Sequence, residues 1–212
     1  MIRSFADRRT RDVAEGRQPR DLPQAILKTA RRKLGFLNAA TSLDALKVPP
    51  GNRLHPLVRD RAGQHAIWIN DQYRICFRWT EAGPEDVEIV DYHRAFEERV
   101  MPNQTDLETQ VDAPIVLPPL HPGEVLREEF MVPLNLTAYA IAKACGVPRT
   151  RIERIAREEI GITADTALRL GRYFGLDARV WLNLQTAFDV ETARRAMGDT
   201  VDRITPLARD AA

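Results

Sequence analysis

Side chains capable of acid–base chemistry gather in one strand-rich stretch of this chain. Three of its four histidines, His55, His65 and His93, fall there. His93 closes the tripeptide Asp91-Tyr92-His93 at the end of a predicted strand, where catalytic groups can reach solvent. Because side chains alternate along a strand, Asp91 and His93 are expected to point to one side and Tyr92 to the other. His65 flanks a turn, and we expect it to have an ordinary structural or surface role.

These residue types suit the metal-free cleavage of RNA. That reaction needs a base for the ribose 2′-OH, a cation facing the phosphate and an acid for the leaving 5′-oxygen. Histidine titrates near neutrality and serves as either base or acid, while Arg74 on the neighbouring predicted strand is suited to holding the phosphate. The sequence contains no HExxH, no paired-carboxylate motif and no glycine-rich phosphate loop, so we expect neither a cofactor nor a metal.

The elements that must position these residues are helices followed by a meander of strands. Apolar residues recur on one helical face between residues 22 and 40. β-Branched and aromatic residues with partial alternation predict strands at 53–57, 65–70, 73–80 and 87–92. Polar residues predict turns at 70–72 and 81–84. The pattern predicts a small α+β domain over residues 1–93, with helices packed on a small antiparallel sheet.

Charge is distributed unevenly along the chain. The total of 31 Lys and Arg against 30 Asp and Glu gives a net charge of +1, but residues 1–60 hold 13 against 6, a net of +7. Part of this excess lies on the predicted helix 22–40, mostly off its apolar face, at Lys28, Arg31, Arg32 and Lys33. We therefore expect a basic outer surface and a local anionic partner.

The second half of the chain is predicted to be helical. Residues 94–117 are acidic and rich in proline near their end, which predicts a linker. The domain expected beyond it, residues 118–198, is all-α, with helices at 122–130, 137–145, 148–158, 164–174 and 178–196. We expect residues 199–212 to be a disordered tail.

A helix-turn-helix is predicted at residues 138–156. Ala142 is small where the helices would cross, and Gly146 suits the bend, where φ is positive or the backbones crowd. Thr137 is a natural N-cap for the first helix, and Pro148 can begin the second.

The second helix of this pair presents polar residues that suit DNA. Arginine binds guanine edges or phosphates, and threonine suits either. The candidates are Arg149, Thr150, Arg151 and Arg154. Glu158 and Glu159 follow directly and would weaken phosphate contacts. Helix pairs of this spacing also occur in proteins that never touch DNA, so spacing alone leaves DNA binding open.

Two further features bear on cellular location. The chain has only two cysteines, Cys76 and Cys145, far apart in sequence, which excludes a disulfide scaffold and fits a reducing compartment. No apolar run approaches the length of a membrane span, and the N-terminus lacks an apolar signal core. We expect a cytoplasmic protein with no membrane partner.

Several long motifs resemble known families. The first part resembles HigB-type toxins of the RelE superfamily, through ARRKL (30–34), VPPGNRLHPL (48–57), NDQYRICFRW (70–79) and VEIVDYH (87–93). The second part resembles HigA-type antitoxins, which carry an XRE-like helix-turn-helix, through PPLHPGEVLREEF (118–130), the helix pair above, GITADTALRLGRYFG (161–175) and WLNLQ (181–185). The resemblance implies a toxin and its antitoxin joined in one chain.

The resemblance implies a function for the first part. Toxins of this family are ribosome-dependent endoribonucleases that cut translated mRNA, with 2′-OH attack giving a 2′,3′-cyclic phosphate. The family's catalytic roles map onto His55, Asp91, Tyr92 and His93, with Arg74 at the phosphate. The basic helix face would then accept ribosomal RNA.

The second part would neutralise the first, by contact within one chain or between chains. It would also bind operator DNA, most simply as a homodimer on a two-fold site.

The sequence departs from these families at two points. Val58 stands where such toxins often carry Lys, with Arg59 as a candidate substitute, and Glu158-Glu159-Ile160 replaces the usual basic turn after the recognition helix. An alternative therefore stays open, in which the chain is a DNA-binding repressor whose first domain is catalytically inactive.

Overall fold

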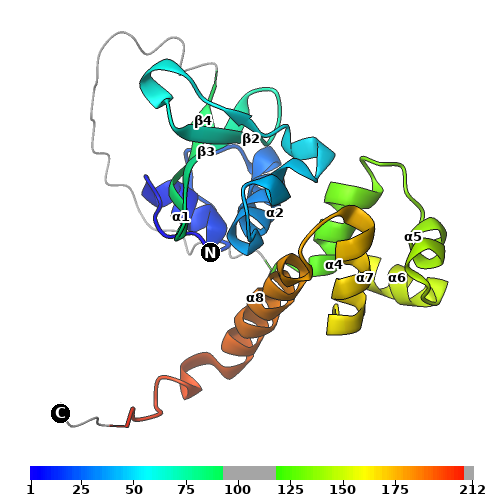
Figure 1. Ribbon diagram of the computed structural model, residues 1–212. Helices are drawn as coiled ribbons and strands as arrows, with labels where there is room; N and C mark the ends of the chain where they lie inside the picture. Colours follow the sequence, from blue (N-terminus) through cyan, green and yellow to red (C-terminus); the bar gives the residue numbers. More distant parts are fainter. Residues whose placement is uncertain (93–117, 208–212) are drawn as a thin grey trace.

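The structure is a computed structural model, and it describes residues 1–92 and 118–207. It has a first part built on a small sheet and a second, helical part (Figure 1). The predicted linker 94–117 lies outside the described residues, and so does His93. The first two residues of the predicted tail 199–212 belong to a short 3₁₀ helix, η5 (Gly198–Thr200), and the tail is exposed as far as residue 207.

A four-stranded antiparallel sheet forms the framework of the first part. Its strands follow chain order and comprise β1 (His55–Pro56), β2 (Gln64–Trp68), β3 (Tyr73–Thr80) and β4 (Gly83–Asp91). The β2–β3 turn is fixed by the Asn70 side chain, whose Oδ1 accepts from the backbone N–H groups of Gln72 and Tyr73 at 3.0 and 2.7 Å. The predicted turn at 81–84 is shorter, because Gly83 already belongs to β4.

Two helices cover one face of this sheet. They are α1 (Arg8–Ala14) and α2 (Gln24–Ala39), and the sheet face beneath them is buried and apolar, with Ile67, Ile75, Phe77, Val87 and Ile89. Thr10 is fully buried and accepts from the backbone N–H of Ile89 at 2.8 Å, which fixes α1 to β4. Three short 3₁₀ helices complete the part: η1 (Asp44–Lys47), η2 (Pro50–Asn52) and η3 (Arg59–Arg61).

The second part is helical, as predicted. Helix α4 (Pro122–Val125) continues into the π-helical segment η4 (Leu126–Met131), and α5 (Ala138–Cys145), α6 (Arg149–Ala156), α7 (Ala164–Phe174) and α8 (Ala178–Met197) follow. Their shared core centres on Phe130 and Trp181, whose ring centroids are 5.3 Å apart. The fold is therefore α+β followed by all-α, which confirms the predicted fold class.

The two parts pack against each other through α2. Its outer side contacts α4 and α8, and η2 contacts η4. Figure 1 shows α8 running beside α2 as it leaves the helical part. At the centre of the contact, the rings of Phe36 and Phe130 lie 6.1 Å apart and both are buried. One buried apolar cluster therefore runs through both parts.

Candidate functional site

A row of alternating guanidinium and aromatic groups crosses the sheet on the face opposite α1 and α2. The Arg53 guanidinium lies 3.5 Å from the Trp68 ring centroid, and that of Arg74 lies 4.8 Å from the same ring. Arg74 also lies 5.1 Å from the Tyr92 ring. We call Arg53, Trp68, Arg74 and Tyr92 the cation–aromatic row. Such contacts hold a cation over the electron-rich ring face.

Strand register builds this row. Trp68 pairs with Arg74 across β2 and β3, and His55 pairs with Ala66 across β1 and β2. Arg53 precedes β1 and ends η2 in a left-handed backbone conformation (φ 46°), from which its side chain reaches over Trp68. Cross-strand neighbours on one face lie close enough for their side chains to touch. Arg53 and Arg74 therefore both contact the Trp68 ring.

Arg74 and Tyr92 are held by the turn between β2 and β3. The Arg74 guanidinium donates to the backbone oxygens of Asn70 and Asp71, the latter at 3.2 Å, and the Tyr92 N–H donates to the Gln72 oxygen at 2.7 Å. Burial lowers the pKa of Arg74, with Tyr92 and Asp71 opposing the shift and nearby Arg53 adding to it. Arg74 thus sits partly desolvated next to a second cation.

His55 lies on the same face as the row, two residues after Arg53. Its Nδ1 is 2.9 Å from the Arg53 carbonyl oxygen, and the side chain is half-buried. That hydrogen bond orients the imidazole and leaves its other nitrogen for chemistry. The structure therefore brings His55, Arg74 and Tyr92 to one face of the sheet.

Asp91 lies on the other face. It pairs with Tyr73, whose side chain is buried towards the helices, and its Oδ2 accepts from Gln72 Nε2 at 2.7 Å. It lines a polar hollow together with Arg20 and Gln72. The predicted alternation of Asp91 and Tyr92 holds, and it separates Asp91 from the row. His93, predicted on the side of Asp91, lies outside the described residues.

His65 differs from His55 in its surroundings. Its ring stacks on Phe77 with centroids 6.0 Å apart, and burial lowers its pKa, with the neighbouring charges of His55 and Lys47 acting in the same direction. A neutral imidazole against the core fits the structural role expected for it.

The cations on α2 meet carboxylates of the second part. Arg32 Nε donates to Glu129 Oε1 at 2.6 Å, and Lys33 Nζ donates to Glu129 Oε2 at 2.9 Å. Arg31 donates to both oxygens of Glu191, at 2.9 and 3.1 Å, and to the Pro118 carbonyl. Within the described ranges, every ion pair that joins the two parts has its cation on α2.

The predicted basic outer surface on α2 is wrong for three of its four cations. Arg31, Arg32 and Lys33 are only 6, 8 and 4% exposed, while the Lys28 side chain stays exposed, 3.9 Å from Glu124. The apolar periodicity of α2 identified the side that faces the sheet. It could not show that the second part covers the opposite side as well.

Glu129 is the centre of this interface. It is buried, and each of its two oxygens accepts from a different cation of α2. Burial alone would raise the pKa of Glu129, but Lys33 and Arg32 outweigh it and hold the pKa below its usual value. The carboxylate is therefore ionised at neutral pH.

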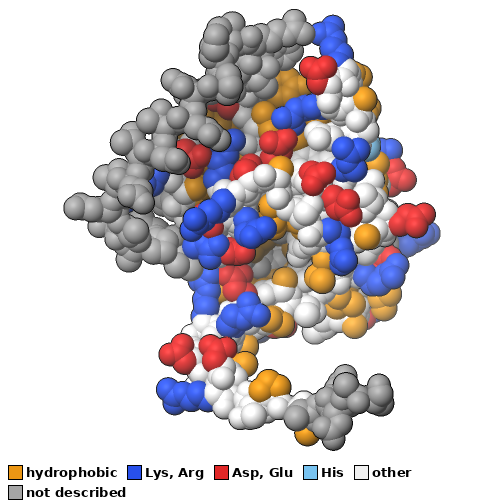
Figure 2. Space-filling model, turned by 90° about the vertical axis from the view of Figure 1, so that its left-hand side faces the viewer, with side chains coloured by type: hydrophobic (Ala, Val, Ile, Leu, Met, Phe, Trp, Pro, Cys, Tyr) orange, Lys and Arg blue, Asp and Glu red, His pale blue; other side chains and the backbone are white. Residues whose placement is uncertain are grey.

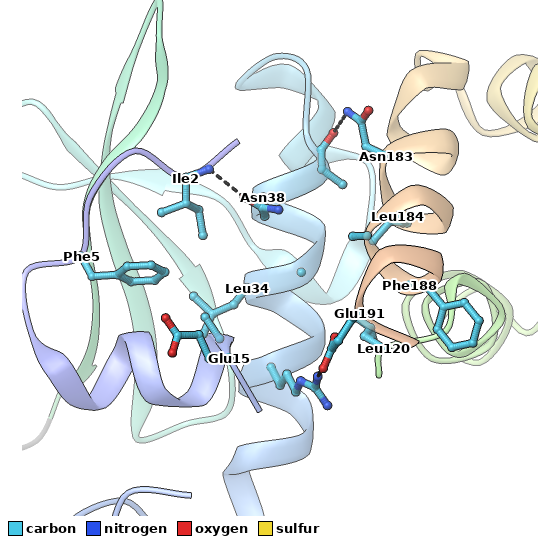
Figure 3. Close-up of a pocket in the computed structure, with 15 residues that line it drawn as sticks. Ile2, Phe5, Glu15, Leu34, Asn38, Leu120, Asn183, Leu184, Phe188 and Glu191 are labelled. Carbon is cyan, nitrogen blue, oxygen red and sulfur yellow. Dashed lines mark hydrogen bonds and ion pairs between the residues drawn. The ribbon is translucent and has the colours of Figure 1, made fainter. Parts of the chain in front are cut away.

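A cavity of about 230 Å³ lies between the two parts beside these ion pairs. Ile2, Phe5 and Leu34 of the first part line it together with Leu184 and Phe188 of α8. Figure 3 shows α2 between Ile2 and Phe5 on one side and α8 on the other. The Arg31–Glu191 pair closes one side of the cavity.

The helix-turn-helix has the predicted local chemistry. The Thr137 side chain caps α5 by accepting from the Ala140 N–H at 3.2 Å, and Gly146 ends α5 at φ 63°. A positive φ favours glycine because it has no Cβ. Ala142 is buried, and Pro148 stands just before α6, at its N-cap.

Carboxylates pair with each candidate DNA-contacting arginine on α6. The pairs are Arg149–Glu153, Arg151–Asp165 and Arg154–Glu159, at 2.7, 2.6 and 3.3 Å. Thr150 is exposed beside them. Exposed pairs of this kind contribute little stability, so a phosphate can displace the carboxylate at small cost.

Elsewhere the surface is of mixed charge. On the face in Figure 2, Lys and Arg side chains are interspersed with Asp and Glu rather than gathered in one basic field. Among residues 1–92 and 118–207, no three His, Cys, Asp or Glu side chains cluster as metal ligands would. In the same ranges, no helix has the length and apolar character needed to cross a bilayer.

Sequence reasoning missed Arg53 and Trp68. Trp68 could have been found by extending the pairing of the two strands that flank residues 70–72, which sets it opposite Arg74. Arg53 had no such signal, because the register of β1 depends on the course of the irregular segment 57–63.

Comparison with known proteins identifies relatives of both parts. A family model described as the RelE-like toxin of type II toxin–antitoxin system HigB matches residues 3–93. The chain is 36% identical to Toxin HigB-1 of Vibrio cholerae over 67 residues, 32% of this chain and 70% of that protein. It is 32% identical to Antitoxin HigA-1 of the same organism over 89 residues, 42% of this chain and 84% of that protein.

Two further similarities concern an antitoxin and a virulence-associated protein. The chain is 54% identical to Virulence-associated protein I of Dichelobacter nodosus over 95 residues, 45% of this chain and 87% of that protein. The solved structure of Pseudomonas aeruginosa antitoxin HigA with the higBA promoter is 43% identical and has a TM-score of 0.41, covering 42% of this chain and 99% of that one. Because the two Vibrio cholerae relatives are each at least 32% identical and covered over at least 70% of their length, the chain belongs to the HigB and HigA toxin–antitoxin families, and joins a HigB-like toxin domain to a region related to HigA antitoxins.

Proposed function

We propose that this chain is a self-neutralised toxin–antitoxin protein. Residues 1–93 would form an mRNA endoribonuclease domain that acts on translating ribosomes, residues 94–117 a linker, and residues 118–198 an antitoxin domain that holds the nuclease inactive, followed by a tail at 199–212. The observation that carries the proposal is the burial of three α2 cations by Glu129 and Glu191.

The antitoxin domain would neutralise the toxin domain by competing with RNA for the cations of α2. Arg31, Arg32 and Lys33 are the residues, with Lys28, that would face ribosomal RNA in an exposed toxin domain. In the docked chain they are paired with carboxylates instead. Because both parts belong to one chain, docking is intramolecular, with an effective concentration on the order of millimolar. RNA and the second part would therefore exclude each other from α2.

The proposed reaction uses the face that carries the cation–aromatic row. The ribose 2′-oxygen attacks the adjacent phosphorus, the bond from phosphorus to the 5′-oxygen breaks, and the products are a 2′,3′-cyclic phosphate and a 5′-hydroxyl. The base takes the 2′-OH proton and the acid protonates the 5′-oxygen, roles supplied among His55, Tyr92 and His93. Arg74 would hold the phosphate. Asp91, on the other face, would act only indirectly.

A release variant tests this proposal. Changing Glu124, Glu129 and Glu191 together to Gln leaves every toxin-part side chain intact while removing the charges that hold α2. In a reconstituted translation system, primer extension should show mRNA cuts with this variant, few with the wild-type chain, and none when His55→Ala is added. A release variant that undocks, seen as a larger radius of gyration by X-ray scattering, yet cuts nothing would overturn the nuclease assignment.

We also propose that α5 and α6 bind operator DNA and regulate transcription, most simply as a homodimer. The support is the helix-turn-helix geometry, the exposed Arg149, Thr150 and Arg154, and a relative 36% identical over 72 residues that is named as an HTH-type transcriptional regulator of Haemophilus influenzae. A gel shift with the DNA upstream of the coding sequence tests it. Binding with no sequence preference would contradict it.

A second function remains a candidate, a DNA-binding repressor whose first domain is catalytically inactive. Two observations favour it. Asp91 lies on the opposite face of the sheet from Tyr92, and Val58, which is 74% exposed, stands where related toxins often carry a cation. Sequence-specific DNA binding without cleavage by the undocked release variant would select this function.

A further inference from the structure

Arg53 and Arg74 form an unusual pair of like charges. Both guanidinium groups lie over the Trp68 indole, at 3.5 and 4.8 Å from its centroid. Within the described residues neither forms an ion pair with a carboxylate, whereas Arg61 on the same face is paired with Glu88 at 2.8 Å. Two cations held together without a carboxylate repel each other, and a bound anion would remove that repulsion.

We infer that Arg53, Arg74 and Trp68 form a phosphate-binding site for single-stranded RNA, in which Arg53 is the second cation and Trp68 is a positioning residue. The inference rests on the proposed function for the class of ligand. A phosphodiester between the two guanidiniums accepts charge-assisted hydrogen bonds from both. Because both groups contact the Trp68 ring, the ring would keep them on the same stretch of the RNA backbone.

The location of the site fits a substrate role. His55 follows Arg53 by two residues and pairs with Ala66, two residues before Trp68 on β2, so a phosphate bound by Arg53 would lie on the same face of the sheet as the imidazole. On the other side, Tyr92 flanks Arg74. Aromatic side chains beside arginines are typical of sites for single-stranded nucleic acid, where rings stack on bases.

Arg53, and not Arg59, is placed to supply the cation that is missing at Val58. Arg59 is adjacent in sequence, but it is exposed on η3 near the opposite end of β2. The Arg53 guanidinium lies 3.5 Å from the Trp68 centroid, whereas residues 58 and 59 lie beyond Pro56, which pairs with His65. The separation along β2 is more than three residues, roughly 10 Å or more. Arg53, rather than Arg59, is within reach of the Arg74 site.

The test measures RNA binding separately from cleavage. A fluorescent 2′-O-methyl RNA oligonucleotide cannot be cut, because its 2′-oxygen carries no proton. Its anisotropy gives the affinity of the full chain and of the release variant across a range of salt concentrations. Arg53→Gln should weaken binding about tenfold and reduce the salt slope by about 0.7, the value for one cation on single-stranded nucleic acid. Arg59→Gln, which loses the same charge, should change neither quantity.

Trp68 variants distinguish positioning from simple stability. Trp68→Ala should weaken RNA binding as Arg53→Gln does, and Trp68→Phe should restore most of it with an unchanged melting temperature. Three results would overturn the inference. RNA affinity could fall equally in Arg53→Gln and Arg59→Gln, it could stay unchanged in Arg53→Gln, or neither the wild type nor the release variant could bind RNA. Cleavage that does not depend on Arg53 would overturn it while leaving the nuclease proposal standing. RNA binding that depends on Arg53 without any cleavage would support the inference and contradict the nuclease proposal.

Discussion

Arg32 and Glu129, 97 residues apart in sequence, meet in a buried ion pair in which Arg32 Nε donates to Glu129 Oε1 at 2.6 Å. The second oxygen of Glu129 accepts from Lys33 at 2.9 Å. One carboxylate of the antitoxin part thus pairs with two cations of the toxin part. Such a contact is costly to break from one side, because the remaining charges stay buried without a partner.

Glu129→Gln should therefore destabilise the chain strongly. Lys33 would stay buried without a countercharge, while Arg32 would keep only Glu124 at 3.4 Å; such a loss is expected to cost about 3–5 kcal/mol. Glu128→Gln is the matched control, since Glu128 is adjacent in sequence but partly exposed, and its ion pair among the described residues is with Arg127. Urea unfolding of the full chain measures both. Similar midpoints for the two variants would show that the Glu129 contact adds little.

The Glu129 contact should also depend on pH. Lys33 and Arg32 lower the pKa of Glu129 in the folded chain, so its stabilisation is present above the unfolded value of about 4.3. It is lost as the pH falls through the lower, folded value. Unfolding free energies of wild type and Glu129→Gln should therefore converge below about pH 4. A difference between them that stays constant from neutral to acidic pH would contradict this account.

Cys76 should resist thiol reagents in the native chain. It is 1% exposed on the outer face of the sheet, next to Leu57 and Ala66, and burial raises its pKa to about 11. Burial also raises the pKa of Cys145. At pH 8 only about 0.1% of the Cys76 thiol would be ionised. An absorbance assay with a disulfide reagent should show slow reaction in buffer and rapid reaction of both thiols in urea. Rapid reaction of Cys76 in the native chain would show that the outer face of the sheet becomes accessible to solvent.

DNA binding should depend on the exposed arginines of α6. Arg154→Gln should weaken binding to the upstream DNA and reduce the salt slope by about 0.9, the effect of one lost phosphate contact. Arg194→Gln removes the same charge from the far end of α8 and should leave both unchanged. Equal effects of the two changes in a gel shift would indicate binding through overall charge.

Local patterns predicted most of the elements. The predicted helix 164–174 and strand 73–80 match α7 and β3 residue for residue, because each has clear periodicity and recognisable end signals. Helix α1 was missed, since its segment RRTRDVA is mostly charged and buries only Thr10 and Val13. A buried threonine carries no apolar signal.

Long-range contacts limited the prediction of the site. His55, Arg74 and Tyr92 were named from motifs, but only strand register shows that they share a face and that Asp91 does not. Likewise, the charge pattern located the cations of α2 without revealing that Glu129 buries them. Both facts depend on contacts between residues distant in sequence.

Bacterial growth on induction of matched variants tests self-neutralisation most directly. The wild-type chain should be tolerated, the Glu124→Gln, Glu129→Gln, Glu191→Gln release variant should arrest growth at equal protein level, and His55→Ala in the release variant should restore growth. Arrest by the wild-type chain as strong as that by the release variant would contradict the claim that docking on α2 keeps the toxin part inactive.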